Sequence, residues 1–141
     1  MAGMHLEDLS VGQSAERRDH VTEEVVQAFA EVSGDRNPVH LDEAFAAQTA
    51  FKGRIAHGML SAAYISAVLG NDLPGPGAIY LSQTLSFKRP VRIGDEVVTR
   101  VAVTDIDADR GRVTLAAVCS VNGKAVVEGE AVVMAPRRGA G

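Results

Sequence analysis

The residues of this sequence that could do chemistry together lie in one short run, Ser33-Gly-Asp-Arg-Asn-Pro-Val-His40. The run places a carboxylate, Asp35, five residues before an imidazole, His40. Pro38 has no N–H and disfavours the α conformation in the residue before it, so a rigid polar loop is expected here and a helix is not. An acid and a base held on such a loop can act together on one water molecule. A simpler interpretation is an Asx turn, in which Asp35 and Asn37 cap backbone groups and His40 lies on the surface.

The wider run from Phe29 to His40, followed after five residues by Ala46, resembles the signature of the MaoC-like, (R)-specific enoyl-CoA hydratases (hydratase 2, PhaJ-like). The resemblance implies an α+β hotdog fold, in which a curved antiparallel sheet wraps a long central helix. It also implies that Asp35 and His40 form the catalytic pair and that Asn37 contributes to substrate binding.

Length and composition set broad limits. A chain of 141 residues is about one domain's worth, and its 46% hydrophobic and 23% charged residues are ordinary for a globular protein. The net charge of −4, without a long run of Lys and Arg, argues against a nucleic-acid partner. The single cysteine, Cys119, lies in a β-like run, excludes an internal disulfide and suits a reducing cytosol. We expect a cytoplasmic protein without membrane insertion, with one domain over 1–141, a core over about 11–134 and a loose tail at 136–141.

Local patterns predict the first elements of the fold. A short strand is expected near Gln13–Asp19, and Thr22 can cap a helix whose first turn is acidic. Apolar residues at helical spacing give that helix one face, made by Val25, Phe29 and Val32. A second short helix is expected over residues 42–48, with Phe45 and Ala46 packed on the core.

The longest uncharged stretch, Ile55–Gly70, predicts the central helix. It is rich in Ala, Leu and Met, and Gly70-Asn71 can end it. Roughly sixteen residues are too few to span a bilayer comfortably. Because the stretch is apolar on nearly every side, we expect it to be buried on nearly every side.

A pattern of period two follows the turn-rich residues 74–77 and predicts the sheet. It runs from Ile79 to Phe87 as one strand, and three further strands are expected at Val97–Val103, Arg112–Val121 and Ala125–Met134. Asn122-Gly123 is a strong hairpin signal. Successive strands joined by short turns after a helix indicate an antiparallel sheet. The segment Ser86–Asp95 is also similar to a strand-to-turn segment of the hotdog family, which extends the resemblance to about residues 11–134.

Hydration of a double bond conjugated to a thioester defines what the site must do. A water must lose a proton, Cα must gain one, and the thioester oxygen must be stabilised as it becomes negative. The resemblance implies that His40 activates the water, whereas Asp35 positions it and protonates Cα. Addition from one face would give a (3R)-hydroxyacyl product.

The start of the central helix is the expected oxyanion site. First-turn N–H groups are free of helical partners, and Gly58 has no side chain to block an approaching oxygen. The family places its oxyanion donor at the matching glycine. His57 could orient this turn as a neutral residue or take part in catalysis, and the first of these is favoured. The resemblance also puts Ser66 and Leu69 on the wall of the acyl pocket, although Ser66 could instead bond the helix backbone and Leu69 could be core.

No metal site is expected, because the four histidines are scattered and no zinc-ligand spacing occurs. The implied substrate is a coenzyme A thioester, and no further cofactor is expected. Basic residues that could meet its phosphates are Lys52, Arg54, Lys88, Arg89 and Arg92, although solvated surface charge is the commoner role of such residues.

Two other functions stay open. The chain could be a dehydratase for substrates on acyl carrier protein, or for branched or dicarboxylic acyl-CoA. It could also be an acyl-thioester binding module without catalysis, although such a module would not need an acid–base pair. The family's habit of covering its sheet edges implies a homodimer.

Overall fold

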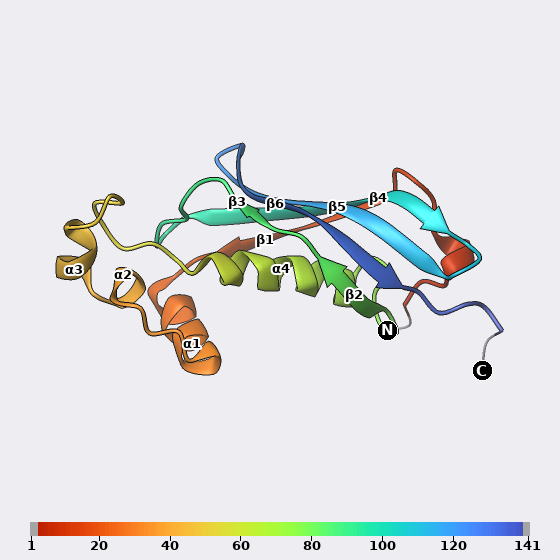
Figure 1. Ribbon diagram of the computed structural model, residues 1–141, viewed down its shortest axis with the longest axis horizontal. Coiled ribbons are helices and arrows are strands. Elements are labelled where there is room, and N and C mark those ends of the chain that lie inside the picture. Colours follow the sequence, from red (N-terminus) through yellow and green to blue (C-terminus); the bar gives the residue numbers. More distant parts are fainter. Residues whose placement is uncertain (1–2, 140–141) are drawn as a thin grey trace.

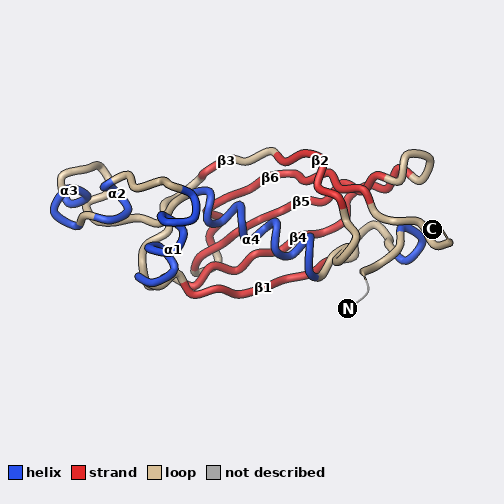
Figure 2. Tube along the Cα trace, turned by 90° about the horizontal axis from the view of Figure 1, so that it is seen from below, coloured by secondary structure: helices blue, strands red, loops and turns tan. Residues whose placement is uncertain are grey.

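The computed structural model describes residues 3–139, which form an antiparallel sheet with one long helix across one face (Figures 1 and 2). The strands are β1 (Ser14–His20), β2 (Ile79–Gln83), β3 (Ser86–Phe87), β4 (Glu96–Asp107), β5 (Arg112–Val121) and β6 (Lys124–Met134). Within the described residues these six strands are ordered β1-β4-β5-β6-β2, and β3 also pairs with β6. The arrangement is the α+β hotdog fold that the family resemblance implies.

The helices divide between the sheet and one end of the molecule. The long helix is α4 (Gly58–Asn71), and a short 3₁₀ helix, η1 (Leu6–Asp8), precedes β1. Three further helices, α1 (Glu23–Ser33), α2 (Pro38–Leu41) and α3 (Glu43–Ala47), lie beyond the end of the sheet at which α4 begins (Figure 1). The segment with the acid and the imidazole therefore lies next to the first turn of the central helix.

The last three strands agree closely with the sequence pattern. β5 spans the predicted Arg112–Val121, and Asn122-Gly123 makes the turn to β6 with positive φ angles of 51° and 79°. β4 continues from its predicted end at Val103 to Asp107. It can do so because a bulge between Val103 and Asp105 lets the pairing with β5 resume.

The single strand predicted from Ile79 to Phe87 is interrupted. Thr84 and Leu85 lie outside the ladder, between β2 and β3. A Cβ on the facing Gly129 would lie 1.9 Å from the Thr84 carbonyl oxygen, so the backbone between β2 and β3 passes β6 so closely that only glycine fits there. Most side chains of β2 and β3 are exposed, because these strands form an edge that no other part of residues 3–139 covers.

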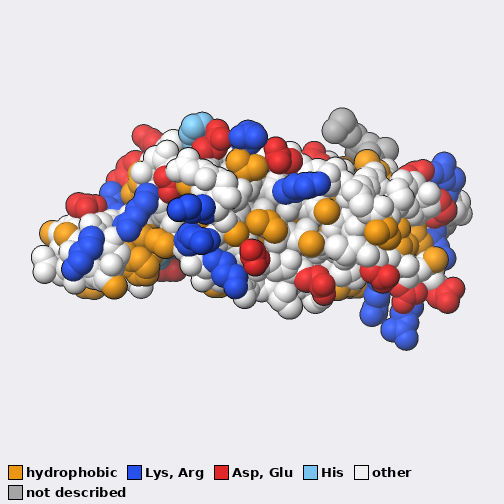
Figure 3. All heavy atoms as spheres, turned by 90° about the horizontal axis from the view of Figure 1, so that it is seen from above, with side chains coloured by type: hydrophobic (Ala, Val, Ile, Leu, Met, Phe, Trp, Pro, Cys, Tyr) orange, Lys and Arg blue, Asp and Glu red, His pale blue; other side chains and the backbone are white. Residues whose placement is uncertain are grey.

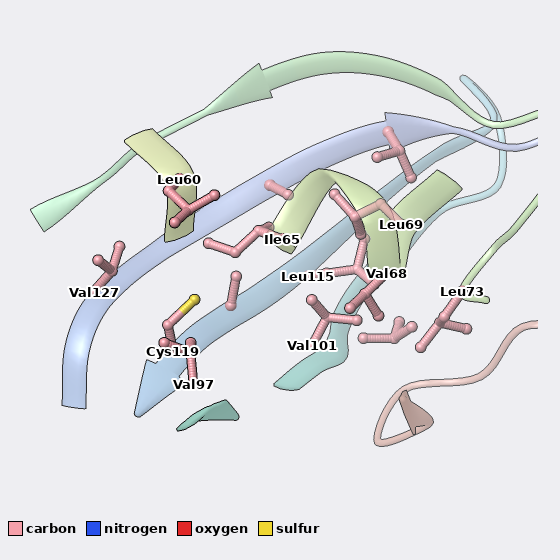
Figure 4. Packing of buried hydrophobic residues seen from close by; sticks show 14 of the residues in the cluster. Leu60, Ile65, Val68, Leu69, Leu73, Val97, Val101, Leu115, Cys119 and Val127 are labelled. Atoms are coloured by element: carbon pink, nitrogen blue, oxygen red, sulfur yellow. The ribbon is translucent and has the colours of Figure 1, made fainter. Parts of the chain in front are cut away.

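Helix α4 packs one face on the sheet (Figure 4). Buried side chains of α4 share one cluster with side chains of β4, β5 and β6: Leu60, Ile65, Val68 and Leu69 with Val97, Val101, Leu115, Cys119 and Val127. A second stripe of the helix is exposed, and its members are Met59, Ala63, Ser66 and Gly70. The expectation of burial on nearly every side is wrong for this chain alone, because the sheet covers only one side.

Helix α4 ends at Asn71, as the Gly70-Asn71 signal predicts, but it begins three residues after the start of the uncharged stretch. Ile55 forms an antiparallel bridge with Arg92, and the Ala56 N–H donates to the Val91 carbonyl at 2.7 Å. These contacts hold the preceding residues extended, so the helix begins only at Gly58. Among residues 3–139, neither α4 nor another helix is long and apolar enough to cross a membrane.

Helix α1 begins as predicted, and two of the three residues predicted on its apolar face pack against the core. The Thr22 hydroxyl accepts the Val25 N–H at 3.2 Å and caps the helix. Val25 and Phe29 are half-buried against the core cluster, and Val26 and Ala30 beside them are buried. Val32, predicted on the same face, is 83% exposed, so the face ends before the last turn.

Helix α3 confirms one of its two predicted core residues. The Asp42 carboxylate accepts the Phe45 N–H at 3.1 Å and caps the helix. Ala46 is fully buried, but Phe45 is 50% exposed. Because α3 projects beyond the end of the sheet (Figure 1), only its inner side has a neighbour to pack against.

Cys119 is a core residue, as its place in β5 predicts. Its Sγ lies 3.4 Å from the Thr99 hydroxyl and 3.5 Å from the Ser61 carbonyl oxygen. Burial raises the pKa of the Cys119 thiol, which disfavours the reactive thiolate.

The two ends of the described chain contact each other. Leu6 is buried in the core, and its N–H donates to the Pro136 carbonyl at 2.8 Å. The Arg138 N–H donates to the Glu7 carboxylate at 2.6 Å. The core therefore begins before residue 11. The expected loose tail is hydrogen bonded up to Arg138, and its last two residues lie outside the described part.

Candidate active site

The segment that carries Asp35 is a chain of local hydrogen bonds. The Asp35 N–H donates to the Ser33 hydroxyl at 3.1 Å, and the Asp35 carboxylate Oδ1 accepts the Asn37 N–H at 3.2 Å. Asn37 Oδ1 in turn accepts the Val39 N–H at 3.1 Å. The Asx-turn interpretation is thus confirmed for Asp35 and Asn37. It uses only one carboxylate oxygen, which leaves Oδ2 outside the turn.

The expectation that no helix forms here is wrong for α2. Pro38 is its first residue, where the missing N–H would have had no helical partner and the fixed φ already suits a helix. Asn37, which precedes the proline, has φ −54° and ψ 126° and so satisfies the restriction on that position. The short helix turns His40 inward.

His40 is not a surface residue, since it is only 8% exposed. Its Nδ1 lies 2.8 Å from the Ile55 carbonyl oxygen. Because a carbonyl oxygen can only accept, Nδ1 must carry the hydrogen, and in the neutral ring Nε2 carries the lone pair. Burial is the largest influence and lowers the pKa of His40 below its ordinary 6.5; His57 adds to this, whereas the Ile55 carbonyl and Asp35 oppose it. The ring is therefore held as a neutral base.

His57 lies against both members of the predicted pair, which the sequence did not indicate. It is the N-cap residue of α4 and is 2% exposed. Its Nε2 lies 2.9 Å from the Asp35 main-chain oxygen, and its ring is stacked on that of His40 with centroids 3.9 Å apart. The expectation of scattered histidines is wrong for these two. Local sequence patterns could not have predicted this contact, because twenty-two residues separate His57 from Asp35.

Potential ligand atoms of Asp35, His40 and His57 all lie within 4.8 Å of one another, which makes them a candidate metal cluster. An imidazole lone pair lies in the plane of its ring, so an ion bound by both histidines must lie near both planes. The rings are stacked at 3.9 Å with an interplanar angle of 28°. In this arrangement their two planes do not meet at a common ligand position. The residues present therefore fit a proton-transfer site better than a metal site.

A cavity of about 510 Å³ opens beside these residues. Asp35, His57 and Gly58 line one side, and apolar residues such as Phe87 and Val127 line much of the rest. His40 is not itself a lining residue, but its ring stacks on that of His57, which is one. The cavity thus presents a carboxylate and a helix start to whatever it holds.

Gly58 is the first residue of α4, where N–H groups have no partner within the helix. A Cβ at this position would lie 2.6 Å from a ring carbon of Phe87. Glycine therefore lets the Phe87 ring lie close to this turn, and it is also suited to the approach of an oxygen.

Ser66 and Leu69 lie further along α4 and do not line this cavity. Ser66 is exposed and lines a groove of about 560 Å³, which shares Met59 with the cavity. Leu69 is 2% exposed, belongs to the core cluster and, with Ser66, lines a small hollow of about 130 Å³. Cavity, groove and hollow therefore follow one another along the helix.

Basic side chains surround the mouth of the cavity. Lys88 and Arg89 line it directly, and Phe51 connects it to a second hollow lined by Lys52, Arg54 and Arg92, with Glu43 as the acid among the lining residues. Figure 3 shows Lys and Arg beside hydrophobic side chains in the half of the molecule that carries α2 and α3. This local excess of positive charge contrasts with the net charge of −4.

Arg54 differs from the other candidate cations because its guanidinium forms a salt bridge with a carboxylate. Its Nε donates to the His40 carbonyl at 2.7 Å, and its Nη2 pairs with Glu23 at 2.7 Å. Arg54 therefore ties α2 to α1, and the remaining candidates for an anionic ligand are those at the rim.

The fold and the site together define a hotdog domain of the MaoC-like class. The model of the family described as "MaoC like domain" matches residues 9–126, and the chain belongs to this family. An (R)-specific enoyl-CoA hydratase from Rhodospirillum rubrum is 53% identical, over 96% of this chain and 94% of that protein. A 3-hydroxybutyryl-CoA dehydratase from Methylorubrum extorquens is 50% identical, over 96% of this chain and 86% of that protein. The unliganded structure of the (R)-hydratase PhaJ1 from Pseudomonas aeruginosa superposes with a TM-score of 0.91 at 51% identity, and the match covers 96% of this chain and 88% of that one.

The lowered pKa of His40 predicts a pH dependence of stability. Because the folded pKa lies below 6.5, the unfolded chain binds more protons at mildly acidic pH. The contribution of the neutral His40 ring to the free energy of unfolding is complete above pH 6.5 and is lost as the pH falls through the pKa of His40 in the folded state. Urea unfolding at about pH 7.5 and about pH 5.5 should show a smaller loss of unfolding free energy in His40→Gln than in the wild type.

The control for this measurement is His20→Gln, because the His20 side chain is 71% exposed. This variant should keep the wild-type pH dependence. An equal loss of stability in the wild type and in His40→Gln would contradict the assignment of a depressed pKa to His40.

Proposed function

We propose that this chain catalyses the reversible, (R)-specific hydration of trans-2-enoyl-CoA to (3R)-3-hydroxyacyl-CoA. The observation that carries the proposal is the pairing of Asp35 with a buried His40 beside the first turn of α4, in a chain about half identical to enzymes of that name. The protein is a hydro-lyase. We propose that it needs no cofactor besides the thioester substrate and that it acts in the cytoplasm.

The proposed chemistry uses one water molecule. The lone pair on His40 Nε2 removes a proton as the water oxygen adds to Cβ, and Asp35, entering this step as the carboxylic acid, delivers its proton to Cα and becomes the carboxylate. Proton transfer between the two side chains then restores the pair, so that the net change is addition of H₂O. Asn37 Oδ1 is occupied by the Val39 N–H, so only the side-chain NH₂ of Asn37 remains to hold the water or substrate.

We assign to the Gly58 N–H the stabilisation of the negative charge that develops on the thioester oxygen of the intermediate. This N–H lies in the first turn of α4, where the helix dipole also favours negative charge. Stabilising the thioester oxygen there would orient Cα and Cβ toward Asp35, which lines the same cavity.

Coenzyme A is the proposed carrier of the acyl group because basic side chains lie around the mouth of the cavity. Its phosphates are anionic, and Lys88, Arg89 and Lys52 carry positive charge around the cavity mouth. The apolar lining between rim and catalytic pair suits the pantetheine arm. Rates with crotonyl-CoA, with carrier-linked crotonate and with a dicarboxylic enoyl-CoA separate this substrate from the alternatives.

The catalytic pair gives the direct test of function. Asp35→Asn and His40→Gln each remove a proton-transfer group with little change in shape, so kcat for crotonyl-CoA should fall about 10²–10⁴-fold. The loss of enoyl absorbance measures the rate, and chiral analysis of the product measures the stereochemistry. Turnover near the wild-type value in either folded variant, or an (S) product from the wild type, would refute the proposal.

The acyl chain is assigned to the path along α4. From the cavity it would pass Met59 and Ser66 and meet Leu69 at the small hollow, which suits roughly four to six carbons. The relative named 3-hydroxybutyryl-CoA dehydratase is named for a four-carbon acyl group. Each further buried methylene would add about 0.8 kcal/mol of binding if space allowed.

Leu69→Ala tests this path. Enlarging the hollow should raise the ratio of kcat/KM for C8 over C4 enoyl-CoA, while loss of a core side chain lowers stability by about 2–5 kcal/mol. Leu115→Ala is the matched control, because Leu115 is equally buried in β5 but lines none of the three spaces. If the C8/C4 ratio of kcat/KM is unchanged in folded Leu69→Ala, Leu69 is a core residue only and does not limit the acyl chain.

A homodimer is proposed to cover the exposed edge. Ile79, Leu81 and Phe87 of β2 and β3 are 56%, 41% and 56% exposed, and the exposed stripe of α4 faces the same groove. An unpaired strand with apolar side chains favours association.

Light scattering should therefore give twice the chain mass of 14.8 kDa. Leu81→Lys should lower the dimer fraction by placing a charge on this edge. Val118→Lys on β5, a residue 37% exposed on a central strand, serves as the control. A stable and active wild-type monomer would contradict the proposal.

A further inference from the structure

His57 joins three parts of the candidate site that are distant in sequence. Its Nε2 bonds the Asp35 main-chain oxygen at 2.9 Å, and its ring stacks on His40 at 3.9 Å. The ring of Phe29 in α1 lies on it at a centroid distance of 4.9 Å and an angle of 59°. The next residue is Gly58, the start of α4. One side chain thus contacts the acid's backbone, the base's ring and the helix that carries the oxyanion donor.

The two nitrogens of His57 have fixed and different surroundings. Because the Asp35 carbonyl oxygen can only accept, Nε2 carries the hydrogen in the neutral ring, and Nδ1 carries the lone pair. Nδ1 is buried, and no group among residues 3–139 hydrogen bonds it. Neither nitrogen can therefore exchange a proton with a substrate. Nε2 is occupied by the backbone, and Nδ1 is out of reach.

An apolar ring of similar shape would avoid the buried, unpaired Nδ1. The imidazole is thus the less favourable choice for packing alone, and the contact that an apolar ring cannot make is the bond from Nε2 to Asp35. That bond holds residues 33–37, whose other hydrogen bonds are local, between residues two to four apart. It fixes the segment to the first turn of α4.

We propose that His57 is a positioning residue for the hydration: its Nε2–H holds Asp35 through the main-chain oxygen, and its ring holds the plane of His40. The inference rests on the proposed function. Together the two contacts set the separation of the carboxylate from His40 Nε2 and place both relative to Gly58. A small displacement of such groups can lower the rate about 10²-fold.

Two variants separate the two contacts. His57→Phe keeps a ring against His40 and loses the N–H, whereas His57→Gln can place an amide N–H near Nε2 and loses the ring. With crotonyl-CoA, kcat should fall about 10–100-fold in His57→Phe, with KM within about 3-fold of the wild type, since no hydrogen bond to the substrate is removed. His57→Gln should recover part of the lost kcat. His20→Gln, on the exposed histidine of β1, should keep wild-type kcat.

Equal kcat in wild type and His57→Phe would overturn the proposal, and so would a His57→Gln variant no faster than His57→Phe. Circular dichroism confirms that each variant is folded. A proportionate loss of kcat and secondary structure in both variants would make His57 merely structural and would also overturn it.

A measurement on the wild-type protein tests the inference without activity. The ¹⁵N shifts of the imidazoles at pH 8 report which nitrogen carries hydrogen, and signals are assigned by their loss in His57→Gln and His40→Gln. We expect the Nε2–H form for His57 and the Nδ1–H form for His40. The Nδ1–H form at His57 would reject the bond to Asp35, even if crotonyl-CoA is hydrated. A wild type with the expected forms but no hydratase activity would instead reject the proposed function.

Discussion

The short extended segment before α4 is the constraint on which the site depends. Ile55 bridges to Arg92, and the Ala56 N–H bonds the Val91 carbonyl at 2.7 Å, so the segment is fixed to the sheet side of the molecule. On its other side, the Ile55 N–H donates to Val39 at 3.3 Å and its carbonyl accepts from His40. One residue therefore connects α2 to the segment between β3 and β4. The burial of α4 against the sheet fixes where this residue lies, and α2 is positioned as a consequence.

Main-chain carbonyls define the state of both histidines. Ile55 selects the Nδ1–H form of His40, and Asp35 selects the Nε2–H form of His57. A carboxylate partner would make this selection depend on its own protonation, whereas a carbonyl is neutral at every pH. The orientation of the two rings is thus a property of the backbone. Burial, which depresses the pKa of His40, comes from the same packing.

Local chemistry made part of this structure predictable from the sequence. The Thr22 cap, the Asn122-Gly123 turn and the Asx turn at Asp35 depend on neighbouring residues alone, and their signals are specific. The α2 helix differs from the prediction because Pro38, which would break the interior of a helix, is the first residue of α2, where a proline is compatible with a helix. The family resemblance indicated Gly58. No local pattern shows that a Cβ at this position would meet the Phe87 ring. Contacts between distant segments, such as His57 with Asp35, need the tertiary fold.

The same limit explains the errors in burial. Spacing correctly showed that α1 has an apolar side, but Val32 is exposed because α1 lies beyond the end of the sheet. The apolar composition of α4 gave no direction at all, so the exposed stripe through Ser66 could not be distinguished from the face that Leu69 buries. Which side of a uniformly apolar helix meets the sheet depends on partners far along the chain.

The break between β2 and β3 has a consequence for how this protein remains in solution. A long, flat, apolar edge is a template on which chains can add without limit. Here Thr84 leaves the ladder opposite Gly129, which divides the edge into two short pieces, and β1 at the opposite edge carries a run of charges from Glu16 to Asp19. The edge formed by β2 and β3 is too short for continuous strand pairing, and the β1 edge is too polar to pair with an apolar strand of another molecule. The close approach of the chain to Gly129 therefore favours finite assembly over fibril growth.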